Sequence, residues 1–176
     1  MSKHLHPSIE SLLKNSFGFP EKILIGQLAT VDPQGPWQRS LRVYGIEEGL
    51  GMIFLTHIGS RKWEELRIDK TLSLCLLNAN WTVQISTRCR AQLLIREGRE
   101  DLFQKYWNLV REDVRKTYLD KQEDLREPGS FFGMIAAEPN YWESLVLEND
   151  YAHSQRFKYE KTDKGIWKEN KIPLYS

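Results

Sequence analysis

The 176-residue chain contains only two cysteines, Cys75 and Cys89, and both lie in apolar runs typical of β-strands. Two thiols this far apart are too few for a zinc ribbon, so we predict that they are buried and reduced. The only closely spaced histidines, His4 and His6, have no cysteine or carboxylate near them that would complete a metal site. We assign both to a terminal tail and predict no metal.

Long hydrophobic runs are also absent. No stretch approaches the ~20 apolar residues that cross a bilayer, and residues 1–7 contain no apolar signal-peptide core. Lys and Arg number 25 against 24 Asp and Glu, so no excess of positive charge favours nucleic acid or anionic lipid. The composition, 40% hydrophobic and 28% charged, is that of a globular protein. We therefore expect a single cytoplasmic domain over residues 1–176 that binds neither membranes nor nucleic acid.

Several familiar catalytic motifs are missing. There is no Gly-rich P-loop ending in Lys-Ser or Lys-Thr, no Gly-x-Ser-x-Gly elbow and no His-Glu-x-x-His zinc motif. The Gly49-Leu-Gly51 pair does not follow a strand and open a helix, as a dinucleotide-binding turn does. These absences leave the common hydrolase and nucleotidase sites without support.

The hydrophobic pattern that is present alternates mainly with period two. It predicts strands separated by short turns, a helix at about 7–18, a helix at about 60–69 and a helical insertion at about 98–120. Turns this close indicate antiparallel pairing, and closure of the sheet removes exposed edges. The predicted fold class is a mainly β, antiparallel barrel with peripheral helices. Its strands are expected at 23–31, 37–46, 52–56, 71–78, 82–95, 131–137, 142–147, 156–160 and 165–168.

A candidate anion site lies where one of these strands ends. Gly59 permits a turn, Ser60 can cap the following helix, and Arg61 and Lys62 fall in its first turn. Free N–H groups and the positive end of the helix dipole favour an anion there. Two cations in the first turn are mildly unfavourable next to this end of the dipole, and a bound phosphate would explain why they are there. Glu64 and Glu65 offer another explanation, in which they balance the charge of an ordinary capped surface helix.

Two polar residues in predicted strands are further candidates. Arg39 shares strand parity with Trp37, Leu41 and Val43, so it interrupts an apolar face, where a guanidinium needs an anionic or hydrogen-bonding partner. It is either a ligand contact or part of the barrel rim. Gln84 is a weaker candidate because a polar residue on the solvent face of a strand needs no special explanation.

In order and spacing, these segments resemble the pyridoxamine 5′-phosphate oxidase-like family of FMN-binding split barrels. The similarity runs from about Leu28 to Ala91 and comprises Ala29-Thr-Val-Asp32 with Gly35, Gln38-Arg39, Ile53-Phe-Leu-Thr56, Gly59-Ser-Arg-Lys62 and Gln84. A fainter similarity covers Arg156-Phe-Lys-Tyr159, Trp167 and Ile172-Pro173. The Ser-Arg-Lys turn with an upstream arginine is moderately specific only as a set.

The resemblance implies an obligate-type homodimer with FMN between the subunits. By that comparison Arg61 and Lys62, with Arg39, hold the phosphate, and Gln84 of the other subunit reaches the isoalloxazine. Residues of the second strand and of the strand before the turn lie along the flavin and ribityl chain. The implied cofactor-binding set is Arg39, Ser40, Leu41, Arg42, Leu55, Thr56, Ser60, Arg61, Lys62 and Gln84.

The chain also departs from the family in the region that binds substrate. The family's oxidases place a lysine where this chain has Tyr44, and their Arg-Leu-His-Asp-Arg run reads Tyr151-Ala-His-Ser-Gln-Arg156 here. The residues that are left to contact a substrate are Tyr106, Arg111, His153 and Arg156. Because a phosphate dianion needs several positioned donors, these departures put vitamin B6 phosphate oxidation in doubt.

The leading hypothesis is an FMN-dependent oxidoreductase in which a small-molecule substrate passes a hydride to flavin N5, with reoxidation by oxygen or another acceptor. No side chain is assigned as an obligatory catalytic base. One alternative is a flavin- or haem-binding carrier or sensor, with His57 or His153 as haem ligands. Another is an interaction protein that has kept the dimeric barrel and lost its cofactor.

Overall fold

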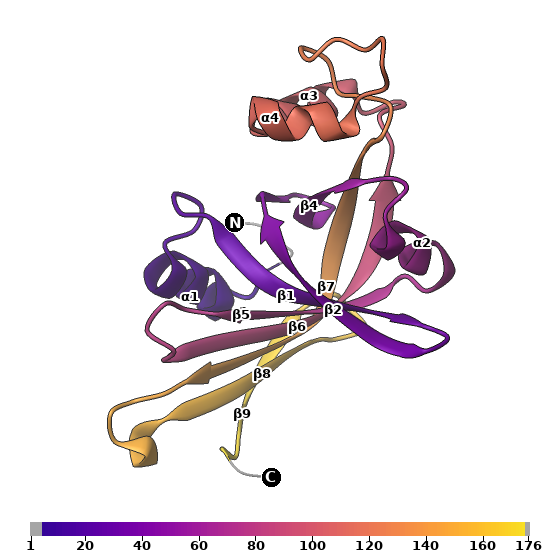
Figure 1. Cartoon of the computed structure of the whole chain (residues 1–176). Helices are drawn as coiled ribbons and strands as arrows, with labels where there is room; N and C mark the ends of the chain where they lie inside the picture. Colours follow the sequence, from indigo (N-terminus) through magenta and orange to yellow (C-terminus); the bar gives the residue numbers. More distant parts are fainter. Residues whose placement is uncertain (1–4, 175–176) are drawn as a thin grey trace.

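A computed structural model describes residues 5–174, which form a nine-stranded antiparallel sheet with a few peripheral helices (Figure 1). Its hydrogen-bonded order is β2-β1-β5-β6-β7-β4-β3, and β8 joins β7 to β9. His4 lies outside the described residues. The elements are α1 (Pro7–Phe17), β1 (Leu24–Asp32), β2 (Gly35–Val43), β3 (Gly45–Glu47), β4 (Gly51–His57), α2 (Arg61–Ile68), β5 (Thr71–Leu77), β6 (Val83–Leu94), α3 (Glu100–Trp107), α4 (Glu112–Arg115), η1 (Lys116–Tyr118), β7 (Phe132–Val146), η2 (Tyr151–His153), β8 (Gln155–Lys161) and β9 (Trp167–Ile172).

The sheet is open, so the prediction that it closes into a barrel is wrong. The end strands of the order, β2 and β3, are not paired with each other among residues 5–174. A second difference from the prediction lies in β7, which is one 15-residue strand where the sequence suggested two. Residues 132–137 pair with β4, whereas residues 141–146 pair with β8 on the same edge. Between these halves, Pro139 has no N–H to donate and the β6–β7 register shifts at Arg88/Cys89. The sheet therefore divides at this point, and β2 and β3 remain at the two ends of the strand order.

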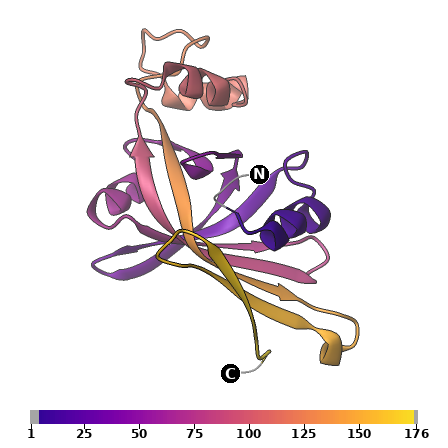
Figure 2. The ribbon, with the colours of Figure 1, turned by 180° about the vertical axis from the view of Figure 1, so that it is seen from behind.

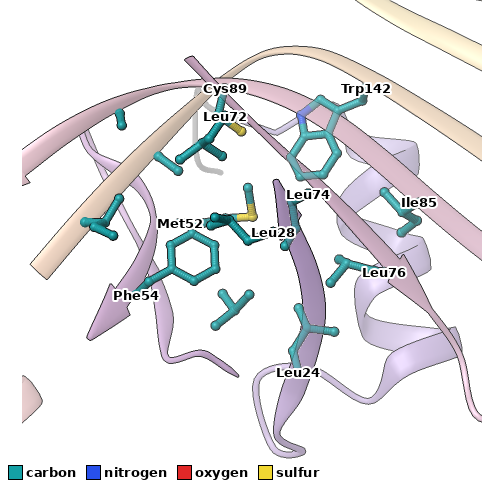
Figure 3. Close-up of a cluster of buried hydrophobic side chains, with 14 of the residues drawn as sticks. Leu24, Leu28, Met52, Phe54, Leu72, Leu74, Leu76, Ile85, Cys89 and Trp142 are labelled. Carbon is teal, nitrogen blue, oxygen red and sulfur yellow. The ribbon is translucent and has the colours of Figure 1, made fainter. Parts of the chain in front are cut away.

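The inner face of the sheet encloses the larger hydrophobic core (Figure 3). In β5 buried and outward-pointing residues alternate strictly, so that Leu72, Leu74 and Leu76 lie in this core and their sequence neighbours point outward. Leu28, Met52, Phe54 and Trp142 complete its centre. The same alternation places Cys89 inside, where burial raises the pKa of its thiol to about 12. Cys75 lies on the outer face and is only half-buried, contrary to the prediction.

Helix α1 covers one side of this core. Pro7 stands in its first turn, Gly18 ends it in a left-handed conformation, and Ile9 and Leu13 are buried. His6 accepts a hydrogen bond from the Ser8 N–H at 3.2 Å, and its ring contacts the Tyr159 ring in a tilted arrangement with centroids 4.8 Å apart. It caps the helix, so its assignment to an unstructured tail was incorrect.

A helical insertion joins β6 to β7 and projects beyond the sheet (Figure 1). It consists of α3, α4, η1 and a loop. Phe103, Tyr106 and Trp107 of α3 pack with Ile53, Leu55 and Phe132 of the outer sheet face into a second, smaller core. At the opposite end of the molecule, η2 connects β7 to the β8–β9 hairpin, which Figure 2 shows from behind. No helix in residues 5–174 is long and apolar enough to cross a membrane.

A candidate anion-binding site at the start of helix α2

The turn after β4 places a group of polar side chains at the first turn of α2. Ser60 occupies the N-cap position in an extended conformation, as the sequence suggested, but its side chain makes no capping hydrogen bond. Its Oγ instead lies 3.0 Å from Thr56 Oγ1, and the Lys62 Nζ donates to the same Thr56 oxygen at 3.0 Å. The first N–H groups of α2 are therefore left without a side-chain acceptor at the cap.

A buried carboxylate, Glu65, organises the two arginines of the site. It accepts hydrogen bonds from Arg39 Nη2 at 2.7 Å and from Arg61 Nε at 2.8 Å, and its side chain is only 4% exposed. Thr30 Oγ1 donates to Glu65 and accepts from Arg39, while Arg61 also pairs with Asp32. Burial alone would raise the pKa of Glu65, but the bonds from Thr30 and Arg39 outweigh it and hold the pKa below the ordinary value. Glu65 is therefore ionised and fixes both guanidinium groups.

Lys62 differs from the arginines because no carboxylate lies within 4 Å of its ammonium among residues 5–174. Burial and the nearby charge of Arg39 hold the pKa of Lys62 below its ordinary value. Both effects disfavour the charged form, and a bound anion would relieve the second directly. The three cations and two carboxylates of the cluster leave one net positive charge.

Enough donors remain in this cluster for a phosphate group. A guanidinium has five N–H groups, and the bonds described above use two from Arg39 and two from Arg61. The Lys62 ammonium, the Ser60 hydroxyl and the α2 amides add to these. The residues present thus fit a phosphate dianion at a helix N-terminus, with the carboxylates fixing the donors in place.

The other predicted cofactor residues of β2 and β4 divide between the two faces of the sheet. Leu41 packs against the inner core, and Leu55 is buried in the second core. Ser40 is exposed and accepts a hydrogen bond from Gln27 at 2.8 Å. Arg42, on the outer face, stacks over Tyr44 at 4.6 Å, and its Nε is buried with no hydrogen-bond partner in the described chain.

Gln84 and Arg39 of one chain point to opposite faces of the sheet. Val83 and Ile85, the neighbours of Gln84 on β6, are buried in the inner core, so Gln84 points to the outer face. Arg39 has the strand parity of Leu41, which packs against the inner core.

The four candidate substrate residues are also dispersed. Tyr106 is buried in the second core, where its hydroxyl donates to Glu47 at 2.5 Å. Arg111 is exposed in the insertion and pairs with Asp113 at 2.5 Å. His153 in η2 is exposed beside Asp150, and Arg156 of β8 pairs with Glu143 at 2.8 Å. The β8–β9 hairpin lies at the opposite end of the molecule from the insertion (Figure 1). One chain does not gather these residues into one pocket.

Sequence reasoning missed the residues that support the arginines. Asp32, Thr30 and the positioning role of Glu65 were not predicted, and neither was Trp37, whose half-exposed ring lies 4.1 Å from the Arg61 guanidinium. One signal was available, because Arg61 and Glu65 stand four residues apart on a helix and so face each other. Thr30 and Asp32 become neighbours of Arg39 and Arg61 only through strand pairing, which the sequence does not display.

Comparison with known proteins places this chain in a family. Residues 14–143 match the family described as pyridoxamine 5′-phosphate oxidase. No curated protein matches the chain. A pyridoxamine 5′-phosphate oxidase-related, FMN-binding protein from Nostoc punctiforme PCC 73102 is similar in structure, with a TM-score of 0.80 and 20% identity over 98% of this chain and 100% of that one.

Two further solved structures share the fold. PhzG from Burkholderia lata 383, in complex with tetrahydrophenazine-1-carboxylic acid, gives a TM-score of 0.73 and 22% identity over 96% of each chain. General Stress Protein 26 from Bacillus anthracis str. Sterne gives 0.54 and 16% over 76% of this chain and 92% of that one. At these identities the structural matches show the fold alone.

Proposed function

Because the chain belongs to the pyridoxamine 5′-phosphate oxidase family, we propose that it binds FMN and acts as an FMN-dependent oxidoreductase on a small molecule. The observation that carries this proposal is the cluster at the start of α2, in which Glu65 fixes Arg39 and Arg61 while Lys62 has no carboxylate partner among residues 5–174. The description of the Nostoc relative as FMN-binding supports the choice of cofactor.

In this proposal the residues have distinct tasks. Lys62 and Arg61 bind the FMN phosphate together with Ser60 and the α2 amides, and Arg39 adds charge from β2. The hydroxyl of Thr56 orients the Lys62 ammonium through the bond at 3.0 Å. FMN, when bound, would supply the redox chemistry of hydride transfer from the substrate to N5, with oxygen or another acceptor as the final oxidant. The protein contributes orientation, charge and exclusion of water.

We further propose that the active form is a homodimer. If Gln84 contacts a flavin bound at α2, we assign that contact to a second copy, because Gln84 points from the outer face of β6 whereas Arg39 has the strand parity of the inner face. The outer face around Gln84 also carries large exposed apolar side chains, with Ile25 59% and Leu77 41% exposed. Unpaired apolar side chains on a sheet face are typical of an interface between subunits.

The cofactor proposal is tested by titrating FMN fluorescence against the wild type and Lys62→Ala. We expect saturable quenching by the wild type and an affinity lower by at least about tenfold in the variant, since a charge-assisted phosphate contact is lost. The matched control is Arg67→Ala, on the last turn of the same helix, where the side chain pairs with Glu64. Absence of quenching by the wild type would refute the cofactor proposal.

The redox proposal needs a separate measurement. FMN-loaded protein is mixed under argon with candidate substrates, including pyridoxamine 5′-phosphate, and bleaching of the flavin absorbance is followed. A substrate that bleaches bound FMN faster than free FMN supports the oxidoreductase. Purified protein that carries haem in place of flavin would support the carrier alternative.

Sedimentation of the wild type and Leu77→Glu tests the dimer, which the added charge should dissociate.

A further inference from the structure

A cleft of about 510 Å³ lies between α1 and the strands β7, β8 and β9, and we call it the α1–β9 cleft. It lies on the inner side of the sheet, because Tyr159, which lines it, belongs to the larger core. Ser144, another lining residue, is paired with Ile85 of the same core. The volume is in the range of small-molecule sites, and the lining comes from elements that do not build the α2 cluster. The cleft is therefore separate from the proposed cofactor site.

The polar lining of the cleft consists of hydroxyl groups and a carboxylate. Ser8 Oγ donates to Glu169 Oε2 at 2.8 Å, which joins α1 to β9. The hydroxyls of Ser144 and Tyr159 lie 3.2 Å apart, and both residues are only 1% exposed. Burial and the nearby charge of Glu169 raise the pKa of Tyr159, so this phenol is neutral. Two buried hydroxyls and one carboxylate thus line the cleft together.

Glu169 has no cationic partner within the described part of the chain. No lysine or arginine nitrogen lies within 4 Å of its carboxylate in residues 5–174. Lys171 stands two residues further along β9, on the same face of the strand, but does not pair with it. By contrast, Glu160 on the adjacent strand pairs with Lys158 at 3.0 Å. The carboxylate that lines the cleft is thus left for a cation from outside the chain.

His6 does not neutralise this carboxylate. Its Nδ1 lies 3.7 Å from Glu169 Oε2 and accepts a hydrogen bond from the Ser8 N–H at 3.2 Å. A ring nitrogen that accepts a hydrogen bond carries no proton, so the imidazole is neutral with its proton on Nε2. Two acceptor atoms therefore face each other across 3.7 Å. A cation near both would replace this repulsion by attraction.

The chemistry of the cleft favours a primary ammonium group on an apolar body. The carboxylate disfavours anions, and the hydroxyl oxygens keep free lone pairs that can accept the three N–H groups of an ammonium. The rest of the lining is apolar, with Leu12, Val146 and Phe157 packed at the edge of the larger core. The rings of Phe157 and Tyr159 lie 6.5 Å apart, and aromatic rings attract organic cations.

We propose that the α1–β9 cleft binds a small primary ammonium compound with an aromatic body, with Glu169 as its counter-ion. Such a ligand would contact α1 and β9 at once and so stabilise the packing of the helix on the sheet. The inference goes beyond the flavin-dependent function and does not depend on it. The cleft lies on the inner side of the sheet, whereas the proposed subunit interface uses the outer face, so a dimer does not have to cover it.

The test is the affinity of 2-phenylethylammonium, measured by calorimetry for the full chain with and without FMN. The comparison ligands are 2-phenylethanol, which lacks the charge, and 3-phenylpropionate, which reverses it. Nα-acetyl-lysinamide represents the lysine side chain of a protein partner. The variants are Glu169→Gln and Tyr159→Phe. Glu160→Gln is the matched control, because it removes a carboxylate of the same size from the opposite face of the adjacent strand.

2-Phenylethylammonium should bind with a Kd of about 1 mM or tighter, and both comparison ligands without the ammonium at least about tenfold more weakly. Glu169→Gln should weaken its binding about tenfold, and Tyr159→Phe about threefold, because one acceptor is lost. Glu160→Gln should leave the affinity unchanged. No saturable binding by the wild type, or equal affinities in Glu169→Gln and Glu160→Gln, would overturn the proposal. Tighter binding of Nα-acetyl-lysinamide would also overturn it and assign the cleft to a protein partner.

The outcomes also separate this proposal from the cofactor proposal. Because the two sites share no residue, added FMN should change the affinity for 2-phenylethylammonium by less than about twofold. If the wild type binds FMN and no ammonium compound, the cleft proposal fails and the cofactor proposal stands. If it binds the ammonium compound through Glu169 and no FMN, the opposite holds.

Discussion

The start of α2 and the helical insertion both carry arginines, but the two regions hold them differently. Arg39 and Arg61 converge from two elements on the buried carboxylate of Glu65. Arg111 pairs only with Asp113, two residues away, and its side chain is 78% exposed. A guanidinium fixed by a buried partner is ready to meet a ligand, whereas an exposed one must first be ordered. The difference indicates that the chain is prepared for an anion at α2 and not at Arg111.

The largest effect is expected from Glu65→Gln. The change leaves Arg39 and Arg61 side by side without their shared carboxylate, and removing one partner of a buried ion pair is strongly destabilising. We expect the free energy of unfolding to fall by about 3 kcal/mol in urea denaturation. Glu64→Gln, at the adjacent exposed position, is the control and should be close to the wild type. Equal stability of the two variants would show that the cluster is not preorganised.

The same carboxylate predicts a pH dependence. The folded-state pKa of Glu65 is below its ordinary value of 4.5, because the bonds from Thr30 and Arg39 outweigh burial. Its contribution is therefore fully present above pH 4.5 and is lost as the pH falls through the lower folded-state pKa. The stability difference between the wild type and Glu65→Gln should be constant near neutral pH and shrink in acid. A difference that grows in acid would contradict this assignment.

An intermediate effect is expected from Tyr106→Phe in the insertion. The variant removes the hydroxyl that donates to Glu47, leaving that carboxylate with Lys105. We expect a loss of about 1 kcal/mol in the free energy of unfolding, the usual net value of a hydrogen bond. The affinity for FMN should not change. Unchanged stability together with weaker binding of pyridoxamine 5′-phosphate would instead make Tyr106 a substrate contact.

The smallest effect is expected from Arg111→Gln. Its pair with Asp113 is exposed and local, and such pairs contribute little to stability. The urea midpoint and the FMN affinity should both match those of the wild type. A clear fall in either would mean that the insertion is as well organised as the start of α2, and the comparison above would fail.

Local pattern was sufficient to predict much of the fold. The alternation in Thr82–Ile95 predicted β6, and Pro7 with Gly18 marks the ends of α1. The Asp163-Lys-Gly165 turn joins β8 to β9, with Gly165 at a φ of 73°. These features depend on neighbours in the sequence, and such signals are readable without a structure.

The errors concern contacts between distant segments. Whether the sheet closes depends on whether its end strands, β2 and β3, pair with each other, and a sequence does not display which distant strands pair. The prediction that Arg39 needs a partner follows from desolvation, but the identity of that partner, Glu65, depends on how α2 packs on β1. Arg42 was expected along the flavin, and only the structure shows that its buried Nε has no partner within the described residues.

The helical insertion leaves the sheet at the end of β6 and returns at the start of β7, two strands that are hydrogen-bonded to each other. Its ends are therefore held together by the sheet, so segments of different length can be accommodated there without shifting the register of any strand. The insertion packs on the outer sheet face through Phe103, Tyr106 and Trp107, whereas the α2 cluster is built from β1, β2 and α2. Exchanging this one segment would therefore leave the residues of the α2 cluster in place.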